Sequence, residues 1–320
     1  MKKEKILTKT GVVCGLALIC CALWGSAFPC VKLGYAMFQI PAAAAASQIL
    51  FAGMRFSLAG LLVLALGSLL QKRPLLPKSL RTLGRAGKLS IFQTILQYIF
   101  FYIGLANTTG VKASIIEGAN VFIAILVASL IFHMEKFTAP KIIGCVAGFA
   151  GVVIVNLNGT GLDFHMTFRG EGLILLSTVA YSFSSVLMKR YSREEDPVTL
   201  SGWQFFFGGL FMMAVGFLCG GKIGPVQAGG DPMLLYLALI SAVAYTLWGI
   251  LLQYNPVSRV AVFGFMNPVL GVVFSAWILQ EGEQAFGWRS LAALVLICIG
   301  IVLVNRAQNP EKINKLAEKK

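Results

Sequence analysis

Long apolar segments alternate with short polar joints along the whole chain. The apolar segments cover approximately 11–33, 47–70, 89–107, 111–132, 139–156, 171–189, 197–219, 233–253, 257–279 and 286–305. Most of them approach or exceed the ~20 residues that a helix needs to cross the hydrocarbon core of a bilayer. The joints are rich in Pro, Gly, Asn and Asp, which end helices and form turns. This pattern predicts an all-α integral membrane protein with ten transmembrane helices.

The composition agrees with a membrane location. Of the 320 residues, 57% are hydrophobic and only 12% are charged, and the mean hydropathy is +0.79. A soluble domain carries about 25% charged residues, so this chain has too little charge to cover a globule in water. The net charge of +14 would suggest nucleic-acid binding in a soluble protein. No stretch interleaves basic and aromatic residues, so we expect no nucleic-acid partner.

The lysines and arginines are distributed unequally between the two sides that the ten segments define. If the N-terminus is cytoplasmic, most of them fall in the two tails and in the inner joints. The exceptions are Lys32, Lys112, Arg169, Lys222 and Arg289 in outer segments, and Arg55 within a span. Cytoplasmic loops carry an excess of basic residues. We therefore expect a multi-pass protein of the cytoplasmic (inner or plasma) membrane with both termini in the cytoplasm.

The second half of the chain repeats features of the first half in the same order. The matching features, at offsets of 148 to 157 residues, are Trp24 and Tyr181, Lys32 and Lys189, Arg55-Phe56 and Gln204-Phe205, Gly60-Leu61 and Gly209-Leu210, Ala119-Asn120-Val121 and Asn267-Pro268-Val269, Glu135 and Glu283, Gly151 and Gly300, and Asn156 and Asn305. Five spans per half is an odd number, so the second half must enter the membrane from the opposite side. Inverted repeats of this kind are common in transporters that work by alternating access, with the solute site between the repeats.

The predicted organisation follows from this duplication. A first five-helix repeat, with its basic N-terminal tail, occupies 1–156, and an outer connector occupies 157–169. A second five-helix repeat occupies 170–306, and a basic cytoplasmic tail occupies 307–320.

These features together resemble the EamA family of the drug/metabolite transporter (DMT) superfamily, over essentially all of 10–306. The resemblance rests on Trp24-Gly25-Ser26 with Lys32, on Arg55-Phe56, on Asn267-Pro268-Val269 leading to Glu283, and on the segment Gly151 to Asn156 with its echo Gly300 to Asn305. It implies ten helices, a central cavity and transport of small solutes. It implies no single substrate, because related members carry amino acids, sugars, nucleotide-type metabolites and toxic compounds. Asn120 departs from the family, which often has proline there, so we expect a straighter fourth helix.

Two charged residues lie within spans. Glu117 is the acidic residue placed clearly inside an apolar segment, and Arg55 is its basic counterpart. Charged side chains inside a membrane are costly and usually have a function or a partner. One interpretation is that Glu117 titrates during transport, or binds a cationic group, while Arg55 tunes its pKa. The alternative is a static Arg55–Glu117 pair that holds two helices together, or side chains that snorkel to the outer headgroups.

Neutral polar and aromatic residues supply the other candidates for a solute site. Asn120 shares a helical face with Glu117, and Asn267, Ser26 and Ser184 add hydrogen-bonding groups at depth. The aromatic candidates in or near the middle of spans are Trp24, Tyr98, Tyr181, Tyr245 and Trp248. Solute sites combine apolar walls with a few polar groups. The alternative is ordinary packing between helices, which we favour for Ser184 and leave open for the others.

Glycine pairs at i, i+4 spacing allow helices to approach closely. Such pairs occur at Gly144 and Gly148 and at Gly216 and Gly220. They are consistent with contacts inside one bundle or with a homodimer, and the sequence does not choose between these.

Other functional classes have little support. The seven cysteines form no C-x-x-C pair and lie in or beside apolar runs, so we expect no metal, disulfide framework or cofactor. No Asp lies within a span, which argues against an intramembrane aspartyl protease, and no phosphate-binding glycine-rich loop is present. We expect no enzyme activity. The sequence favours a secondary active transporter that moves a small organic metabolite, such as an amino acid or a related solute, across the lipid bilayer by alternating access, with export as the expected direction. The driving force is either the gradient of the solute itself or a proton gradient through Glu117. A multidrug or toxic-compound exporter and a non-transporting multi-pass membrane scaffold are the alternative functions.

Overall fold

The computed structural model describes residues 2–41, 43–105, 107–108, 116–156, 167–278 and 288–306. These residues form helices and no strands. The helical segments are α1 (Lys2–Leu7), α2 (Thr10–Met37), α3 (Ala45–Gln71), α4 (Leu80–Ser90), η1 (Ile91–Leu96), α5 (Gln97–Leu105), α7 (Asn120–Leu126), η2 (Val127–Ile131), α8 (Ala139–Asn156), η3 (Phe168–Gly172), α9 (Leu173–Tyr191), α10 (Pro197–Leu218), α11 (Gly230–Tyr254), α12 (Val257–Ala261), η4 (Val262–Phe265), α13 (Met266–Ile278) and α14 (Trp288–Arg306). Most of the expected outer connector and all of the tail over 307–320 lie outside the described residues.

Six helical stretches are long and apolar enough to cross a membrane. They are Thr10–Met37, Ala45–Gln71, Leu80–Leu105, Phe168–Tyr191, Pro197–Leu218 and Gly230–Tyr254. Shorter apolar stretches are Ile116–Ile131, Ala139–Ile154, Val257–Gly271 and Leu294–Asn305. All coincide with predicted segments, so the all-helical membrane architecture is confirmed.

The third helical stretch begins earlier than the apolar pattern predicted. Helix α4 starts at Leu80 because the Ser79 hydroxyl accepts a hydrogen bond from the Thr82 amide at 3.2 Å and caps the helix. The expected start was near residue 89, where continuous hydrophobicity begins. The basic residues Arg81, Arg85 and Lys88 therefore lie on the first turns of a helix.

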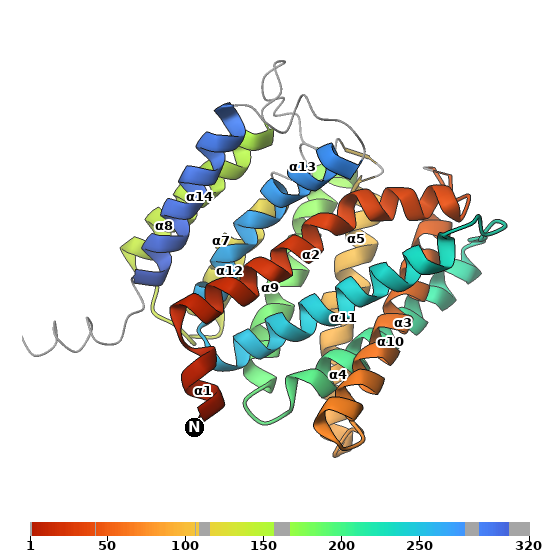
Figure 1. Cartoon of the computed structure of the whole chain (residues 1–320), viewed down its shortest axis with the longest axis horizontal. Helices are drawn as coiled ribbons and strands as arrows, with labels where there is room; N and C mark the ends of the chain where they lie inside the picture. Colours follow the sequence, from red (N-terminus) through yellow and green to blue (C-terminus); the bar gives the residue numbers. More distant parts are fainter. Residues whose placement is uncertain are drawn as a thin grey trace, which may run out of the picture.

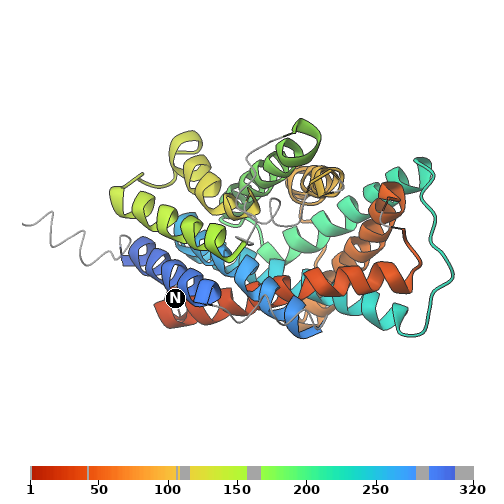
Figure 2. The same cartoon turned by 90° about the horizontal axis from the view of Figure 1, so that it is seen from above.

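Helices α3 and α10 cross with their backbones in close contact, and glycine makes this possible. A methyl group at Gly209 would lie 2.2 Å from the Ser57 amide nitrogen, and one at Gly60 would lie 2.4 Å from that of Phe206. Gly53 approaches the backbone of Met213 equally closely. Small residues are what allow membrane helices to pack backbone to backbone. In both views the α3–α10 pair forms one end of the molecule (Figures 1 and 2).

Helices α8 and α14 form a second close pair at the opposite end (Figures 1 and 2). A methyl group at Gly144 would lie 2.8 Å from the Gly300 carbonyl oxygen, and one at Gly148 would meet the Phe265 ring at 2.3 Å. This glycine pair thus makes contacts inside the chain. Gly216 packs on Leu50 of α3, whereas Gly220 lies beyond the end of α10 with φ +83° and terminates that helix.

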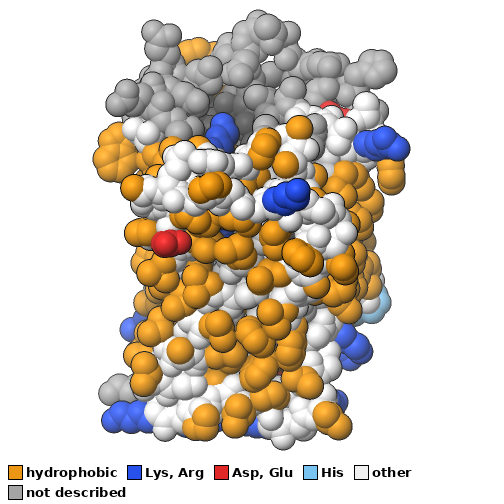
Figure 3. All heavy atoms as spheres, turned by 90° about the vertical axis from the view of Figure 1, so that its right-hand side faces the viewer, with side chains coloured by type: hydrophobic (Ala, Val, Ile, Leu, Met, Phe, Trp, Pro, Cys, Tyr) orange, Lys and Arg blue, Asp and Glu red, His pale blue; other side chains and the backbone are white. Residues whose placement is uncertain are grey.

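Between the two end pairs, helix α2 packs against α11 and α13, and α9 packs against α5 and α7. The surface of this bundle carries an apolar band across its middle, with charged side chains above and below it (Figure 3). Exposed leucine, isoleucine, valine and phenylalanine side chains contribute to the surface on several helices. Such a band is what contact with lipid requires, and the chain is a multi-pass membrane protein.

Polar contacts join distant parts of the chain at the lower end of the molecule in Figure 1. Arg85 on α4 pairs with Glu194 and, at 3.0 Å, with Glu195, both in the turn after α9. The hydrogen bond and charge of Arg85 hold the pKa of Glu194 below its usual range. Nearby, Lys141 pairs with Glu135 at 2.9 Å, and Glu135 also accepts from the Ser258 amide at the start of α12.

The glycine crossing gives a first prediction. Gly209→Ala should destabilise the protein by about 1–3 kcal/mol, because the new methyl group meets a backbone that cannot turn aside. The matched control is Gly15→Ala on α2, where no atom lies within 4 Å, and where alanine is the better helix former. Thermal unfolding of both variants in detergent micelles measures the difference. Equal midpoints for the two variants would contradict the close crossing.

Candidate functional site

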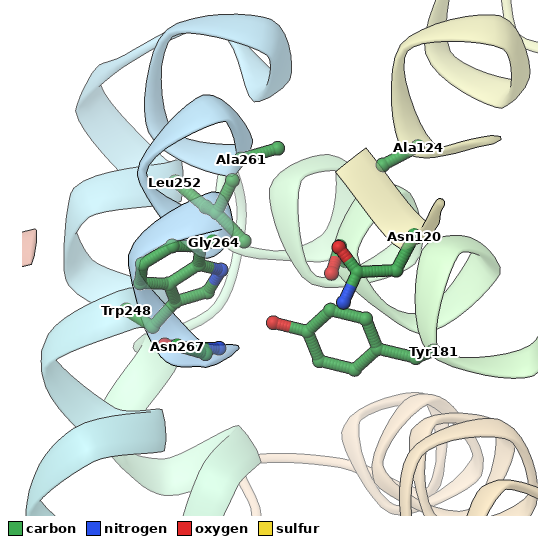
Figure 4. A pocket seen from close by; sticks show the side chains of 9 residues that line it. Asn120, Ala124, Tyr181, Trp248, Leu252, Ala261, Gly264 and Asn267 are labelled. Atoms are coloured by element: carbon green, nitrogen blue, oxygen red, sulfur yellow. The ribbon is translucent and has the colours of Figure 1, made fainter. Parts of the chain in front are cut away.

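A small cavity lies in the middle of the bundle, among α7, α9, α11 and the α12–η4–α13 stretch. It is lined by Asn120, Ala124, Tyr181, Ser185, Trp248, Leu252, Ala261, Gly264 and Asn267. Figure 4 shows Trp248 and Asn267 on one side, facing Asn120 and Tyr181 on the other. The cavity volume is about 10 Å³, which is about the room for one water molecule.

Helical spacing explains how these side chains converge. Tyr181 and Ser185 lie one turn apart on α9, and Trp248 and Leu252 lie one turn apart on α11, so each pair shares a face. Element η4, which carries Gly264, is a tight 3₁₀ turn, and α13 follows it directly.

Asn267 follows this irregular turn on the second residue of α13. The next residue, Pro268, has no amide hydrogen and cannot donate to the Gly264 carbonyl, which favours a break in regular α-helix here. Gly264 has no side chain and so leaves room for the cavity at this point. The Asn267 side-chain oxygen is buried and has no hydrogen-bond partner among the described residues, so it is available to a ligand.

An aromatic cluster adjoins the cavity. The ring of Trp24 on α2 meets the rings of Trp248 and Tyr245 edge-on, each at 5.0 Å. The hydroxyls of Tyr245 and Tyr98 are 2.8 Å apart, and Tyr98 packs on Phe56 of α3 at 4.5 Å. Trp24 therefore connects the cavity to a group of tyrosines deeper in the bundle.

Several buried polar atoms in this region have no hydrogen-bond partner in the described part of the chain. They are Trp24 Nε1, Tyr35 Oη, Gln93 Oε1, Gln97 Oε1 and Asn267 Oδ1. An unsatisfied buried polar group costs about 1–3 kcal/mol. Native proteins keep few such groups, and an unpartnered polar atom in a cavity wall, as at Asn267, is typical of a site that binds a polar ligand or water.

The structure brings together most of the site residues expected from the sequence. Asn120, Tyr181, Trp248 and Asn267 line the cavity itself. Trp24, Tyr98 and Tyr245 form the adjoining aromatic cluster.

Ser26 and Glu117 lie elsewhere. The Ser26 hydroxyl donates to the Leu23 carbonyl at 2.8 Å and is 3.0 Å from the Tyr236 hydroxyl, away from the cavity. Glu117 lies in the helical turn before α7, is partly buried, and does not line the cavity.

Arg55 does not form the expected pair with Glu117. Its guanidinium donates from Nε to the Leu237 carbonyl at 3.1 Å and from Nη2 to the Ser241 hydroxyl at 2.9 Å. Among the described residues, no ion pair includes either Arg55 or Glu117. Both acceptors belong to α11, so α11 rather than the fourth helical stretch holds Arg55 in place.

The sequence missed some members of the site. Ser185 follows Tyr181 by one helical turn, and that spacing could have identified it. Gly264 and Ser241 carried no signal, because their roles depend on which helices lie side by side. Gln93 lies in the π-helical turn η1 and Gln97 directly follows it as the first residue of α5; π-helical turns are frequent at functional sites.

Comparison with known proteins agrees with this architecture. A family model described as the EamA-like transporter family matches residues 12–157 and 168–306. The chain is 28% identical to YvbV of Bacillus subtilis (strain 168), named as an uncharacterized transporter, over 97% of this chain and 96% of that one. It is 26% identical to a protein of Salmonella typhimurium named as a probable amino-acid metabolite efflux pump, over 90% and 93% of the two chains.

A solved crystal structure with 17% identity superposes with a TM-score of 0.72, over 93% of this chain and 99% of that chain, and so has the same fold. The resemblance that the sequence suggested is confirmed, because the family model covers most of the chain. The protein belongs to the EamA-like transporter family.

Proposed function

We propose that this protein is a secondary active transporter that exports a small organic metabolite, an amino acid or a related solute, by alternating access. The observation that carries the proposal is the central cavity, where polar and aromatic side chains from distant parts of the chain converge. The name of the Salmonella relative, a probable amino-acid metabolite efflux pump, supports this solute class and direction.

The proposed architecture is ten membrane helices in two inverted repeats, 1–156 and 170–306. Glycines at the α3–α10 crossing support it. Gly53 and Gly60 on α3 correspond, at an offset of 149 residues, to Gly202 and Gly209 on α10. Gly60 contacts the Gly202 carbonyl, and Gly53 contacts the Gly209 carbonyl, which is the reciprocal pattern expected across a two-fold axis. The family model also matches the chain as two segments of similar length.

The cavity is closed in this conformation. Its volume of about 10 Å³ is far below the ~300 Å³ of a typical small-molecule site. Polar contacts join the two proposed repeats on the inner side, as in Arg85–Glu195. On the outer side, the Gly224 and Gln227 amides donate to the carbonyls of Phe38 and Met37. Solute entry therefore requires the helices to separate on one side at a time, as alternating access demands.

Two other functions remain as alternatives. The aromatic walls suit a multidrug or toxic-compound exporter, since aromatic rings stack on planar or cationic compounds. A scaffold without transport activity is less consistent with the unsatisfied Asn267 oxygen in the cavity wall, which costs stability without serving packing.

The function is tested in proteoliposomes loaded with labelled amino acids or cationic dyes, with and without a pH gradient. Counterflow or efflux of an amino acid supports the proposal. Movement of cationic dyes alone would favour the multidrug alternative, and no movement of any compound would favour the scaffold.

Trp248 provides a test of the cavity. Trp248→Ala should reduce transport at least ten-fold, because it removes the largest side chain of the cavity wall and its contact with Trp24. The matched control is Trp277→Ala, since Trp277 is 77% exposed on α13 and should leave transport nearly unchanged. The initial rate of uptake into proteoliposomes, at equal amounts of reconstituted protein, is the measurement. Equal losses in the two variants would argue against a solute site at this cavity.

Glu117 is proposed to carry the coupling proton. Replacement of Glu117 by Gln keeps the shape of the side chain and removes the titrating group, so transport should lose its response to an imposed pH gradient. Glu4→Gln, on the N-terminal helix α1, is the control and should retain that response. If the Glu117 variant keeps both the rate and the pH dependence of the parent protein, Glu117 has no role in coupling.

The inverted arrangement predicts that both chain ends face the cytoplasm. An impermeant amine reagent added to intact cells should leave Lys9 and Lys320 unmodified, and both should react after the cells are lysed. If the reagent modified one of these lysines in intact cells but not the other, the two chain ends would lie on opposite sides of the membrane. The two repeats would then not be inverted.

A further inference from the structure

Arg55 is a buried positive charge near the middle of a membrane helix. It lies ten residues after the start of α3, which is about 15 Å along the helix axis. This distance is about half of the ~30 Å thickness of the hydrocarbon core. Its exposed fraction is 5%. A cation at this depth is costly unless an anion accompanies it, which is why such residues mark ion or substrate pathways.

The described part of the chain supplies no such anion. The hydrogen-bond acceptors of Arg55, the Leu237 carbonyl and the Ser241 hydroxyl, are both neutral. The ion pairs in the described residues involve Arg81, Arg85 and Lys141, all near the inner surface. Arg55 is thus fixed in orientation by α11 while its charge is left without a counter-ion.

The unused edge of the guanidinium is the one suited to an anion. Nε and one hydrogen of Nη2 are taken by α11, and Nη1 makes no hydrogen bond to the described residues. The planar fork formed by Nη1 and Nη2 binds a carboxylate through two parallel hydrogen bonds, a geometry that lysine cannot provide.

Several tyrosines lie close enough to Arg55 to feel its charge, and their hydroxyls are candidates to complete the site. Those of Tyr35, Tyr98, Tyr102 and Tyr245 lie within electrostatic range of Arg55. The Tyr35 hydroxyl is buried and interacts with the hydroxyl of Tyr102, but it makes no hydrogen bond of normal length and angle to the described residues. A neutral hydroxyl that can donate to an anion, next to a cation without a counter-ion, forms an anion-binding arrangement.

We propose that Arg55, with Tyr35, binds the carboxylate of the transported solute. The remainder of the solute then extends along Trp24 and Tyr245 toward the cavity at Trp248, since these rings are in contact. The proposal rests on the proposed function, in that the central cavity is taken as the solute site. The anion-site proposal narrows the solute class to molecules with a free carboxylate. It also assigns recognition of that carboxylate to the end of the site formed by Arg55 and Tyr35.

The first test compares acids with their amides on the purified protein in detergent. The probes are the common amino acids and, for each, its α-amide, which keeps the side chain and amine but lacks the negative charge. At least one free amino acid should raise the thermal unfolding midpoint in a concentration-dependent manner, and its amide should not. Equal effects of acid and amide, or no effect of any carboxylate, would overturn the proposal. Stabilisation by methyl phosphate but by no carboxylate would also overturn it.

The second test replaces Arg55, the residue proposed to bind the carboxylate. Arg55→Gln should weaken binding of the stabilising acid roughly 10- to 100-fold, as expected for loss of charge-assisted hydrogen bonds, with amide binding unchanged. Arg81→Gln is the matched control, because Arg81 is 74% exposed at the inner surface, and should bind the acid as the parent does. Unchanged affinity of Arg55→Gln for the acid would refute the assignment.

A third variant covers the case in which Arg55→Gln fails to fold. Tyr35→Phe keeps the ring that packs on Phe51 and removes only the hydroxyl, so it should fold normally. It should weaken acid binding several-fold and leave the amide unaffected, and equal affinity of this variant and the parent would count against the site.

The two proposals fail separately. Acid-specific stabilisation without transport in proteoliposomes would overturn the proposed function and leave the anion site standing. Transport of solutes that lack a carboxylate, with equal binding of acids and amides, would overturn the anion site and leave the transporter standing.

Discussion

The close crossing of α3 and α10 is the contact on which the rest of the arrangement depends. In a lipid environment no hydrophobic force drives two apolar helices together, so packing of small residues must supply the attraction. Gly53, Gly60 and Gly209 let the two backbones touch. Arg55 follows Gly53 by two residues, so the same crossing fixes the depth and direction of that arginine against α11. A larger residue at the crossing would therefore disturb the interior as well as the pair itself.

The sequence predicted the architecture because bilayer thickness imposes a strong constraint on helix length and hydrophobicity. The structure confirms the all-helical membrane class, with six helical stretches long enough to span a bilayer and four shorter apolar ones in the described residues, and the family model confirms the predicted family. The start of the third helical stretch was misplaced, since its first turns are basic and amphipathic, and only the cap at Ser79 reveals its beginning. The glycine pattern was also ambiguous. Gly144 packs on α14, whereas Gly220 ends a helix, although both occur in the same four-residue spacing.

The candidate site was predicted less completely. Asn120, Tyr181, Trp248 and Asn267 stood out as polar or aromatic residues within apolar runs, and these line the cavity. Ser26 had the same signature but faces Tyr236, because its direction depends on the rotation of α2 within the bundle. The partner of Arg55 could not be deduced, since Ser241 is 186 residues away and carries no charge. Contacts between helices depend on their register, which hydrophobicity alone does not encode.

The absence of a counter-ion for Arg55 in the described part of the chain also has an electrical consequence. A unit charge changes its energy by about 2.3 kcal/mol for each 100 mV of transmembrane potential through which it moves. If the cavity opens first to one side and then to the other, the guanidinium is exposed in turn to two different potentials. With a solute whose only charge is its carboxylate, the loaded carrier is neutral at Arg55, whereas the empty carrier is positive. The membrane voltage would then act on the return of the empty protein and hardly at all on the step that moves the cargo. A zwitterionic amino acid brings an ammonium group as well, so the voltage would act on both steps.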